Sequence, residues 1–144
     1  MHEALTLDTA LSILREAEAK ARELNVKEDI AVVDEGGNLK AFVRMDGAWL
    51  GSIDIAIRKA RTARLFDMET AKLGKMSQPG EPLYGIEHSN GGLISFGGGI
   101  PIQDGTGTVI GAIGASGSTV DNDVKIAEAG LSAAKASKSA KAAR

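Results

Sequence analysis

A glycine-rich stretch over residues 79–117 limits what this chain can fold into more than any other feature. It holds most of the chain's 18 glycines, including three in a row at Gly97, Gly98 and Gly99. Glycine costs backbone entropy on folding and supplies no side chain to a core. We therefore expect this backbone to pass close to a strand, a second subunit or a ligand, or to adopt positive φ.

The composition is that of an ordinary globular protein. The 144 residues suffice for one domain with a sizeable core, and 43% of them are hydrophobic. The formal net charge is -2, which predicts no general attraction to nucleic acid or to an anionic membrane. No cysteine is present, which excludes disulfides, thiolate metal sites and a thiol nucleophile.

Targeting signals are also missing from the sequence. The first twenty residues lack the basic and apolar regions of a secretory signal. No apolar run approaches the roughly 18 residues that a membrane helix needs. We therefore expect a cytoplasmic protein without a membrane partner.

Local patterns predict helices and strands in a definite order. The spacing of apolar residues predicts helical segments at residues 7–24, 51–66, 69–75 and 120–136. Five runs are typical of strands, and a Gly-Gly-Asn turn joins the first two as a hairpin. These runs are residues 30–33, 39–44, 93–96, 100–103 and 108–115. Residues 76–90 are expected to form a loop with one ordered step at 84–86, and the tail after 136 to fray.

This order of elements favours one domain over residues 1–144. We find no internal repeat and no linker in the sequence. Strands joined by hairpins cannot be parallel neighbours. The predicted fold is therefore α+β, with a five-stranded antiparallel sheet and helices packed on its faces.

Four separated segments resemble one known protein family. They are VVDEGGNLKAFVRMDGA (32–48), SIDIAIRKARTA (52–63), PGEPLYGIEHSNGGLISFGGGIPI (79–102) and GAIGASGSTVDNDVKIAEAG (111–130). Together they resemble the GlcG/HbpS-like family, which includes the C-terminal domain of PduO-type proteins. The resemblance implies a profilin-like fold with a five-stranded antiparallel sheet. It also implies homo-oligomers, either dimers or octamers.

The resemblance implies several functions. Some members of the family bind haem, and one branch is described as haem-degrading. Other members belong to operons for glycolate or diol use, and a further branch is a lyase acting on hydroxylaminobenzoate. We therefore expect a small-ligand-binding domain whose ligand is planar and anionic, with haem as the first choice. The alternatives are a cofactor-independent lyase or related enzyme acting on a small aromatic or hydroxy acid, and an accessory or scaffold subunit of a catabolic operon.

His88 is a candidate axial ligand of haem iron or general base, and the neighbouring Glu87 is a candidate for proton transfer. An imidazole can ligate haem iron or act as a general base, and the other histidine of the chain, His2, lies near the terminus. If the protein is an enzyme, Glu87 or His88 would move protons. The alternative is a solvated turn histidine, because Ser-Asn-Gly-Gly follows it. Apart from haem iron at His88, no metal site is predicted.

Arg44, Asp46, Lys59 and Thr62 are further candidate ligand contacts. An arginine where a strand meets a loop can hold a carboxylate in a bidentate fork, or it can form a surface pair with Asp46. Lys59 belongs to a basic cluster on the second predicted helix. Such clusters are usually solvated, but the family resemblance falls on this segment. Thr62 lies in the same segment and could offer a hydroxyl group to a ligand.

Gly97, Gly98 and Gly99 are predicted to line a ligand pocket with main-chain N–H groups. The alternative is close packing of bare backbone against a helix or a second subunit. No lysine or arginine lies between Lys75 and Lys125 to guard this apolar, glycine-rich region. We therefore expect the chain to self-associate, with the glycine-rich segment at or near the contact.

Overall fold

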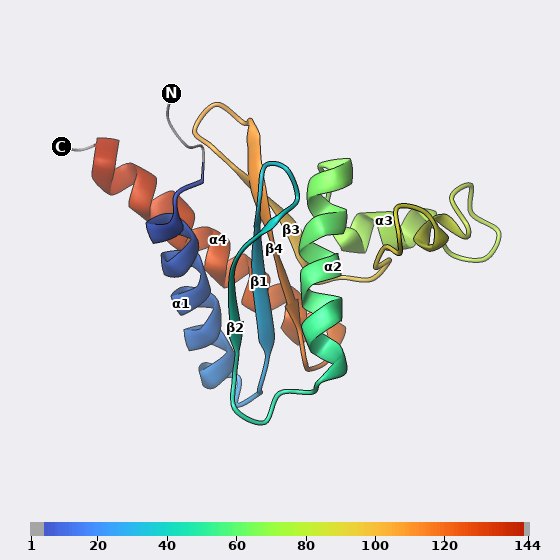
Figure 1. Ribbon diagram of the computed structural model, residues 1–144, viewed down its shortest axis with the longest axis horizontal. Helices are drawn as coiled ribbons and strands as arrows, with labels where there is room; N and C mark the ends of the chain where they lie inside the picture. Colours follow the sequence, from blue (N-terminus) through green and yellow to red (C-terminus); the bar gives the residue numbers. More distant parts are fainter. Residues whose placement is uncertain (1–4, 143–144) are drawn as a thin grey trace.

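The computed structural model describes residues 5–142, and the side chains of residues 5–134. Its fold is α+β, with helices on both faces of one antiparallel sheet (Figure 1). The helices are α1 (Leu7–Glu23), α2 (Gly51–Phe66), α3 (Thr70–Met76), the 3-10 helix η1 (Ile86–His88) and α4 (Val120–Ala142). The strands are β1 (Asp29–Asp34), β2 (Leu39–Arg44), β3 (Gly99–Gln103) and β4 (Val109–Ser116).

The predicted hairpin of β1 and β2 is confirmed. The two strands pair antiparallel, with Asp29 opposite Arg44. The side chain of Asp34 accepts hydrogen bonds from the backbone N–H groups of Gly36 and Asn38, which closes the turn. An aspartate that bonds backbone just ahead of itself is a common device for stabilising such turns.

The prediction of a five-stranded sheet is wrong, because the sheet has four strands in the order β2-β1-β4-β3. The missing strand is the run at residues 93–96. Its backbone contacts helices instead: Ile94 N–H donates to Thr62 Oγ1 at 3.2 Å. A Cβ on Gly74 of α3 would stand only 2.3 Å from the carbonyl oxygen of Ser95. The apolar residues of this run therefore cover α2 and α3 rather than extend the sheet.

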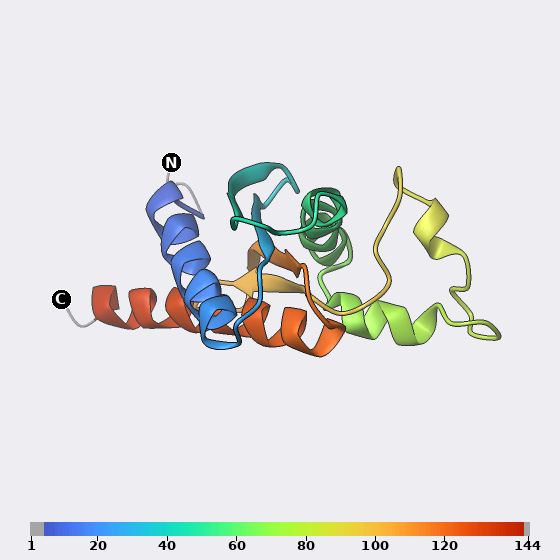
Figure 2. The ribbon, with the colours of Figure 1, turned by 90° about the horizontal axis from the view of Figure 1, so that it is seen from below.

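Two separate cores lie on the two faces of the sheet. Helices α1 and α4 cover one face and α2 covers the other (Figure 2). Ile30 and Val32 of β1 belong to the core under α1 and α4, whereas Ala31 and Val33 belong to the core under α2. The alternation along one strand thus supplies both cores, as expected for a sheet buried on both sides.

Helix α2 lies very close to the sheet because small residues meet at the contact. Its buried face carries Ala56, Ala60 and Ala63. Opposite them, Gly114 of β4 has no room for a side chain, since a Cβ would stand 2.1 Å from the carbonyl oxygen of Ala56. This close approach places Lys59 of α2 directly over the ends of β3 and β4.

Helix α4 is longer than the sequence predicted. It continues to Ala142, beyond the expected end at residue 136. The prediction of a frayed tail also covers residues 143–144, which lie outside the described residues. Within the described part of the chain, no helix has both the length and the apolar character needed to cross a bilayer.

Residues 77–96, called the arm below, extend away from the sheet beyond α3 (Figure 1). The arm contains η1, two residues later than the ordered step predicted at 84–86. Its base is held by α2, where Arg58 Nη1 donates to the carbonyl oxygens of Gly91 and Gly92. Thr62 of the same helix accepts from Ile94, so α2 fixes where the arm returns to the sheet.

The edge strand β3 is protected against pairing with another strand. Gly99 N–H donates to Thr70 Oγ1 at 2.9 Å, so a side chain occupies the donor that an added strand would use. Pro101, in the middle of the strand, has no N–H group to donate. Both features are known ways of blocking an exposed sheet edge. The glycine-rich segment therefore has protection that the sequence did not reveal.

Candidate functional site

Lys59 is buried in the fold instead of belonging to a solvated basic face. Its side chain is 0% exposed, and Nζ lies 3.0 Å from Oδ2 of Asp123 in the first turn of α4. Nζ also donates to the carbonyl oxygen of Ala115 at 2.8 Å and lies 5.0 Å from the centre of the Phe96 ring. Burial lowers the pKa of Lys59, and the Asp123 carboxylate opposes that shift. This geometry makes Lys59 a link between α2, β4 and α4.

Glu28, which directly precedes β1, is a third buried ionisable residue near Lys59 and Asp123. It is 0% exposed, and neither of its oxygens accepts a hydrogen bond. Burial, and next the neighbouring Asp123 carboxylate, raise the pKa of Glu28 to about 9. A protonated, uncharged Glu28 fits both its burial and its raised pKa. Lys59 then balances the one remaining carboxylate charge.

Gly97, Gly98 and Gly99 pack inside the subunit, which is the alternative that the sequence left open. A Cβ on Gly98 would stand 2.6 Å from Lys59 Nζ, and Gly98 has a φ of +126°. A Cβ on Gly99 would stand 2.3 Å from the carbonyl oxygen of Lys59. Gly98 and Gly99 therefore let Lys59 pass the start of β3 and reach Asp123, whereas a Cβ on Gly97 would stand 2.7 Å from Val124 of α4. The three glycines line none of the cavities described below.

The other predicted site residues lie in different parts of the structure. Thr62 is buried and uses its hydroxyl oxygen to hold the arm. Arg44 and Asp46 are exposed at and just after the end of β2, and Asp46 lines a cavity of about 290 Å³. Glu87 and His88 sit on the arm, with His88 Nε2 3.9 Å from Glu87 Oε1 and its side chain 86% exposed. The predicted site is therefore not assembled as a single pocket within one subunit.

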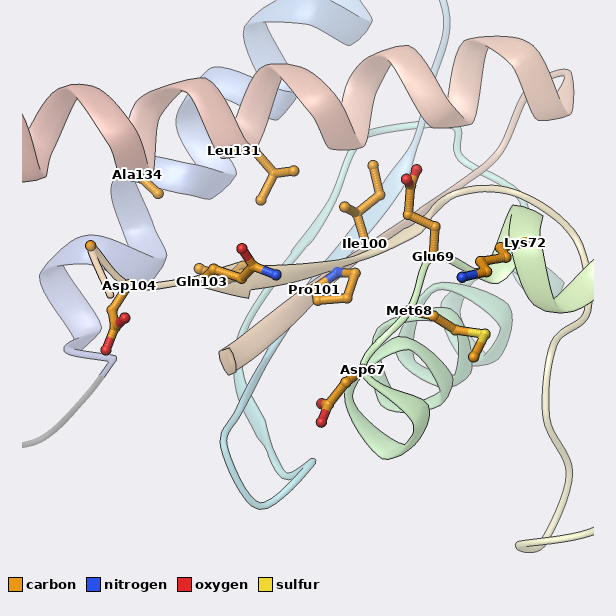
Figure 3. Close-up of a pocket in the computed structure, with 12 residues that line it drawn as sticks. Asp67, Met68, Glu69, Lys72, Ile100, Pro101, Gln103, Asp104, Leu131 and Ala134 are labelled. Atoms are coloured by element: carbon orange, nitrogen blue, oxygen red, sulfur yellow. The ribbon is translucent and has the colours of Figure 1, made fainter. Parts of the chain in front are cut away.

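The largest cavity described here is a groove of about 620 Å³ beside the edge strand β3 (Figure 3). Its apolar wall comes from β3 and from Leu131 and Ala134 of α4. The junction of α2 and α3 supplies Met68, Lys72 and acidic groups, and Glu69 points toward α4 (Figure 3). The lining residues are Asp67, Met68, Glu69, Lys72, Ile100, Pro101, Ile102, Gln103, Asp104, Gly105, Leu131 and Ala134.

A second cavity, the sheet-end cleft, has a volume of about 480 Å³. It lies where β1 begins, β2 has ended and β4 runs into α4. Trp49, the only tryptophan of the chain, lines it and is 66% exposed. The lining residues are Asn25, Val26, Lys27, Gly47, Trp49, Gly117, Ser118 and Thr119. The smaller cavity that contains Asp46 adjoins it and shares Asn25, Val26 and Lys27.

Sequence reasoning missed the residues of this cleft. The sequence pattern pointed to no role for Trp49, yet exposed tryptophans are enriched at binding surfaces. Lys27 and Trp49 are separated by 21 intervening residues, and Thr119 follows much later in the chain. No local motif connects them, so only the fold brings them to one place.

Fold and cavities together define the class of this protein. It has an α+β fold built on one four-stranded sheet, and among the cavities of its described residues the groove and the sheet-end cleft fall within the range of roughly 300–1,000 Å³ typical of small-molecule sites. A buried ion pair links its two helical layers.

The chain belongs to the family described as haem degrading protein HbpS-like, which it matches over residues 5–132. This confirms the resemblance to the GlcG/HbpS-like family. The chain is 42% identical over 128 residues to an uncharacterized 15.0 kDa protein in the dhaT-dhaS intergenic region of Citrobacter freundii, covering 88% of this chain and 89% of that protein. It is 36% identical over 131 residues to the corrinoid adenosyltransferase PduO of the same organism. That match covers 90% of this chain but only 39% of PduO.

Solved structures agree with this assignment. The crystal structure of Klebsiella pneumoniae protein ORFY has a TM-score of 0.90 and 38% identity, with 94% of each chain covered. The crystal structure of a PduOC:heme complex has a TM-score of 0.86 and 35% identity, with 90% of this chain and 94% of that chain covered. The fold is therefore shared with a protein that was crystallised with haem.

Proposed function

We propose that this chain binds a planar anionic small molecule, with haem as the first candidate. Membership of the HbpS-like family supports the proposal, as does similarity to the PduOC:heme complex over nearly the whole chain. The observation that carries it on this chain is Trp49 in the sheet-end cleft, beside the ammonium group of Lys27. An aromatic face suits a flat ring, and an ammonium group suits a carboxylate.

The residues present fit the organic part of haem. The cleft offers an indole ring, an ammonium group and two hydroxyl groups to an amphipathic ring with carboxylate substituents. Bound haem would supply its own iron chemistry. Glu87 and His88, proposed from the sequence as the groups that would ligate iron or move protons, lie on the arm and line none of the three cavities. This arrangement favours the binding function over the lyase alternative.

A hemin titration tests the proposed function. The purified protein is titrated with hemin, and the Soret band is followed against a denatured sample of the same protein. A saturable spectral change near one hemin per subunit is the expected result. Trp49→Ala should weaken the binding, because the flat contact surface is lost. A linear, non-saturating response like that of the denatured sample would reject haem as the ligand.

A further inference from the structure

The sheet-end cleft combines groups that recognise a flat, negatively charged molecule. Trp49 presents a largely exposed ring. The ammonium group of Lys27 lies over the backbone of Gly47, because a Cβ added to that glycine would stand 2.9 Å from Lys27 Nζ. Lys27 also lines the adjoining smaller cavity, so its side chain lies at the boundary between that cavity and the sheet-end cleft. It is the only charged side chain among the residues that line the cleft.

Two hydroxyl groups of the cleft have protons to donate. Thr119 Oγ1 accepts from Asn122 N–H at 3.2 Å, and Ser118 Oγ accepts from the Asn122 side chain at 3.0 Å. Both oxygens are therefore already acceptors, and their O–H groups suit an acceptor on a ligand. The backbone N–H of Ser118 is already used by Asp123, at 3.1 Å. That N–H group is therefore not available to a ligand in the cleft.

Gly117, which forms the floor of the cleft, packs tightly against the backbone of Lys27 and against the buried Glu28. A Cβ on Gly117 would stand 2.5 Å from the carbonyl oxygen of Lys27 and 2.8 Å from Glu28 Oε2. Glu28 lies near Asp123, which in turn is paired with Lys59. The position of the floor is thus fixed by a network that reaches into the core. A preformed floor lowers the cost of ordering on binding.

The groove beside β3 is less suited to an anion. Its lining includes three acidic residues, Asp67, Glu69 and Asp104, against the single ammonium group of Lys72. Asp67 is paired with Arg64, which still leaves the groove with no excess of positive charge. A ligand that carries carboxylates is therefore drawn to the cleft with Lys27 rather than to the larger groove.

We propose that the sheet-end cleft is the ligand site, and that it recognises the porphyrin ring and a carboxylate rather than the iron. This inference rests on the proposed function. Haem iron is usually held by His, Met, Cys or Tyr. The residues that line the cleft instead offer an indole, an amide, an ammonium group and hydroxyls. Met45, in the adjoining cavity, uses its sulfur to accept the N–H of Glu28 at 3.4 Å. A metal-free porphyrin should therefore bind about as well as hemin.

Parallel titrations with hemin and metal-free protoporphyrin IX test this inference. The proteins compared are the unmodified chain, Lys27→Gln, Trp49→Ala and Trp49→Phe, with Lys72→Gln as the matched control in the groove. Both lysines are exposed, so each substitution removes one surface charge. We expect both ligands to bind the unmodified chain with Kd values within about threefold. Lys27→Gln and Trp49→Ala should each raise Kd roughly tenfold, since a charge-assisted contact or a ring contact is lost. Trp49→Phe and Lys72→Gln should change it little.

The possible failures are distinguishable. If the unmodified chain binds neither ligand saturably, the proposed function fails and this inference fails with it. If hemin binds but protoporphyrin IX does not, the iron is recognised and only this inference is overturned. Loss of affinity in Lys72→Gln but not in Lys27→Gln would place the ligand in the groove and would also overturn it. His88→Ala belongs in the same series, because a shifted Soret band there would assign iron ligation to the arm.

Discussion

Nζ of Lys59 lies 3.0 Å from Oδ2 of Asp123, and this buried pair joins α2 to the first turn of α4 past the start of β3. Lys59 explains why glycines stand at positions 98 and 99, since its side chain and backbone occupy the space that a Cβ there would need. The pair also explains why a basic residue stands on a helix face that is otherwise lined with alanines. The family motif around Lys59 therefore includes a residue whose role in this fold is to hold α2 and α4 together.

Removing the charge of Lys59 should destabilise the fold strongly. We expect Lys59→Met to lower the free energy of unfolding by about 3–5 kcal/mol, because the Asp123 carboxylate would remain buried without its partner. The double variant Lys59→Met with Asp123→Leu should recover much of that loss. Urea denaturation measures both, with exposed Lys72→Met as the control. A loss below about 1 kcal/mol in the single variant would contradict the buried-pair interpretation.

Glu28 should make the protein less stable as pH rises. Its folded pKa is raised from 4.5 to about 9, so the folded chain keeps a proton that the unfolded chain releases. The stabilisation is complete below the unfolded pKa and is lost as pH rises through the folded pKa. The free energy of unfolding should fall by up to about 1.4 kcal/mol per pH unit between about pH 5 and pH 9.

Denaturation curves at several pH values measure this slope, and Glu28→Gln should flatten it. Glu81→Gln, at an exposed position on the arm, is the matched control and should leave the slope unchanged. Asp29, which is also buried and has a pKa raised by burial, adds a slope of the same sign that both variants keep. An equal slope in the unmodified chain and in Glu28→Gln would show that Glu28 is ionised in the fold.

Gly98 should tolerate no side chain, and its substitution should unfold the subunit rather than separate subunits. A Cβ there would stand 2.6 Å from Lys59 Nζ and 2.7 Å from the carbonyl oxygen of Ala115, with φ at +126°. We expect Gly98→Ala to cost at least about 2 kcal/mol of stability. Gly105→Ala, with no atom within 4 Å of the added Cβ, should change stability by less than about 0.5 kcal/mol. Thermal unfolding with light scattering separates loss of folding from loss of assembly.

We expect subunits of this protein to associate with one another. The described surface exposes several large apolar side chains, and such groups gather at subunit contacts. They are Leu7, Leu39, Trp49, Leu50, Leu65, Tyr84, Phe96 and Val120. We expect light scattering to give a mass of at least two subunits at micromolar concentration. A monomeric mass at every concentration would contradict the prediction.

The sequence by itself determined the elements whose signals are local. Apolar spacing predicted α2 to the residue, and the Gly-Gly-Asn turn predicted the hairpin of β1 and β2. The quoted motifs also predicted the family that the comparisons confirm. These features depend on neighbouring residues or on matching letters, so they need no knowledge of what packs against them.

Only the tertiary structure decided how distant segments meet. The run at 93–96 has the composition of a strand, yet its backbone packs against helices α2 and α3 and pairs with no strand of the described sheet. Lys59 is buried because Asp123, far along the chain, supplies its partner. Trp49, Lys27 and Thr119 form one cleft because three loops converge at the end of the sheet. Burial, charge pairing and cavity shape depend on such contacts between distant residues, which local patterns do not encode.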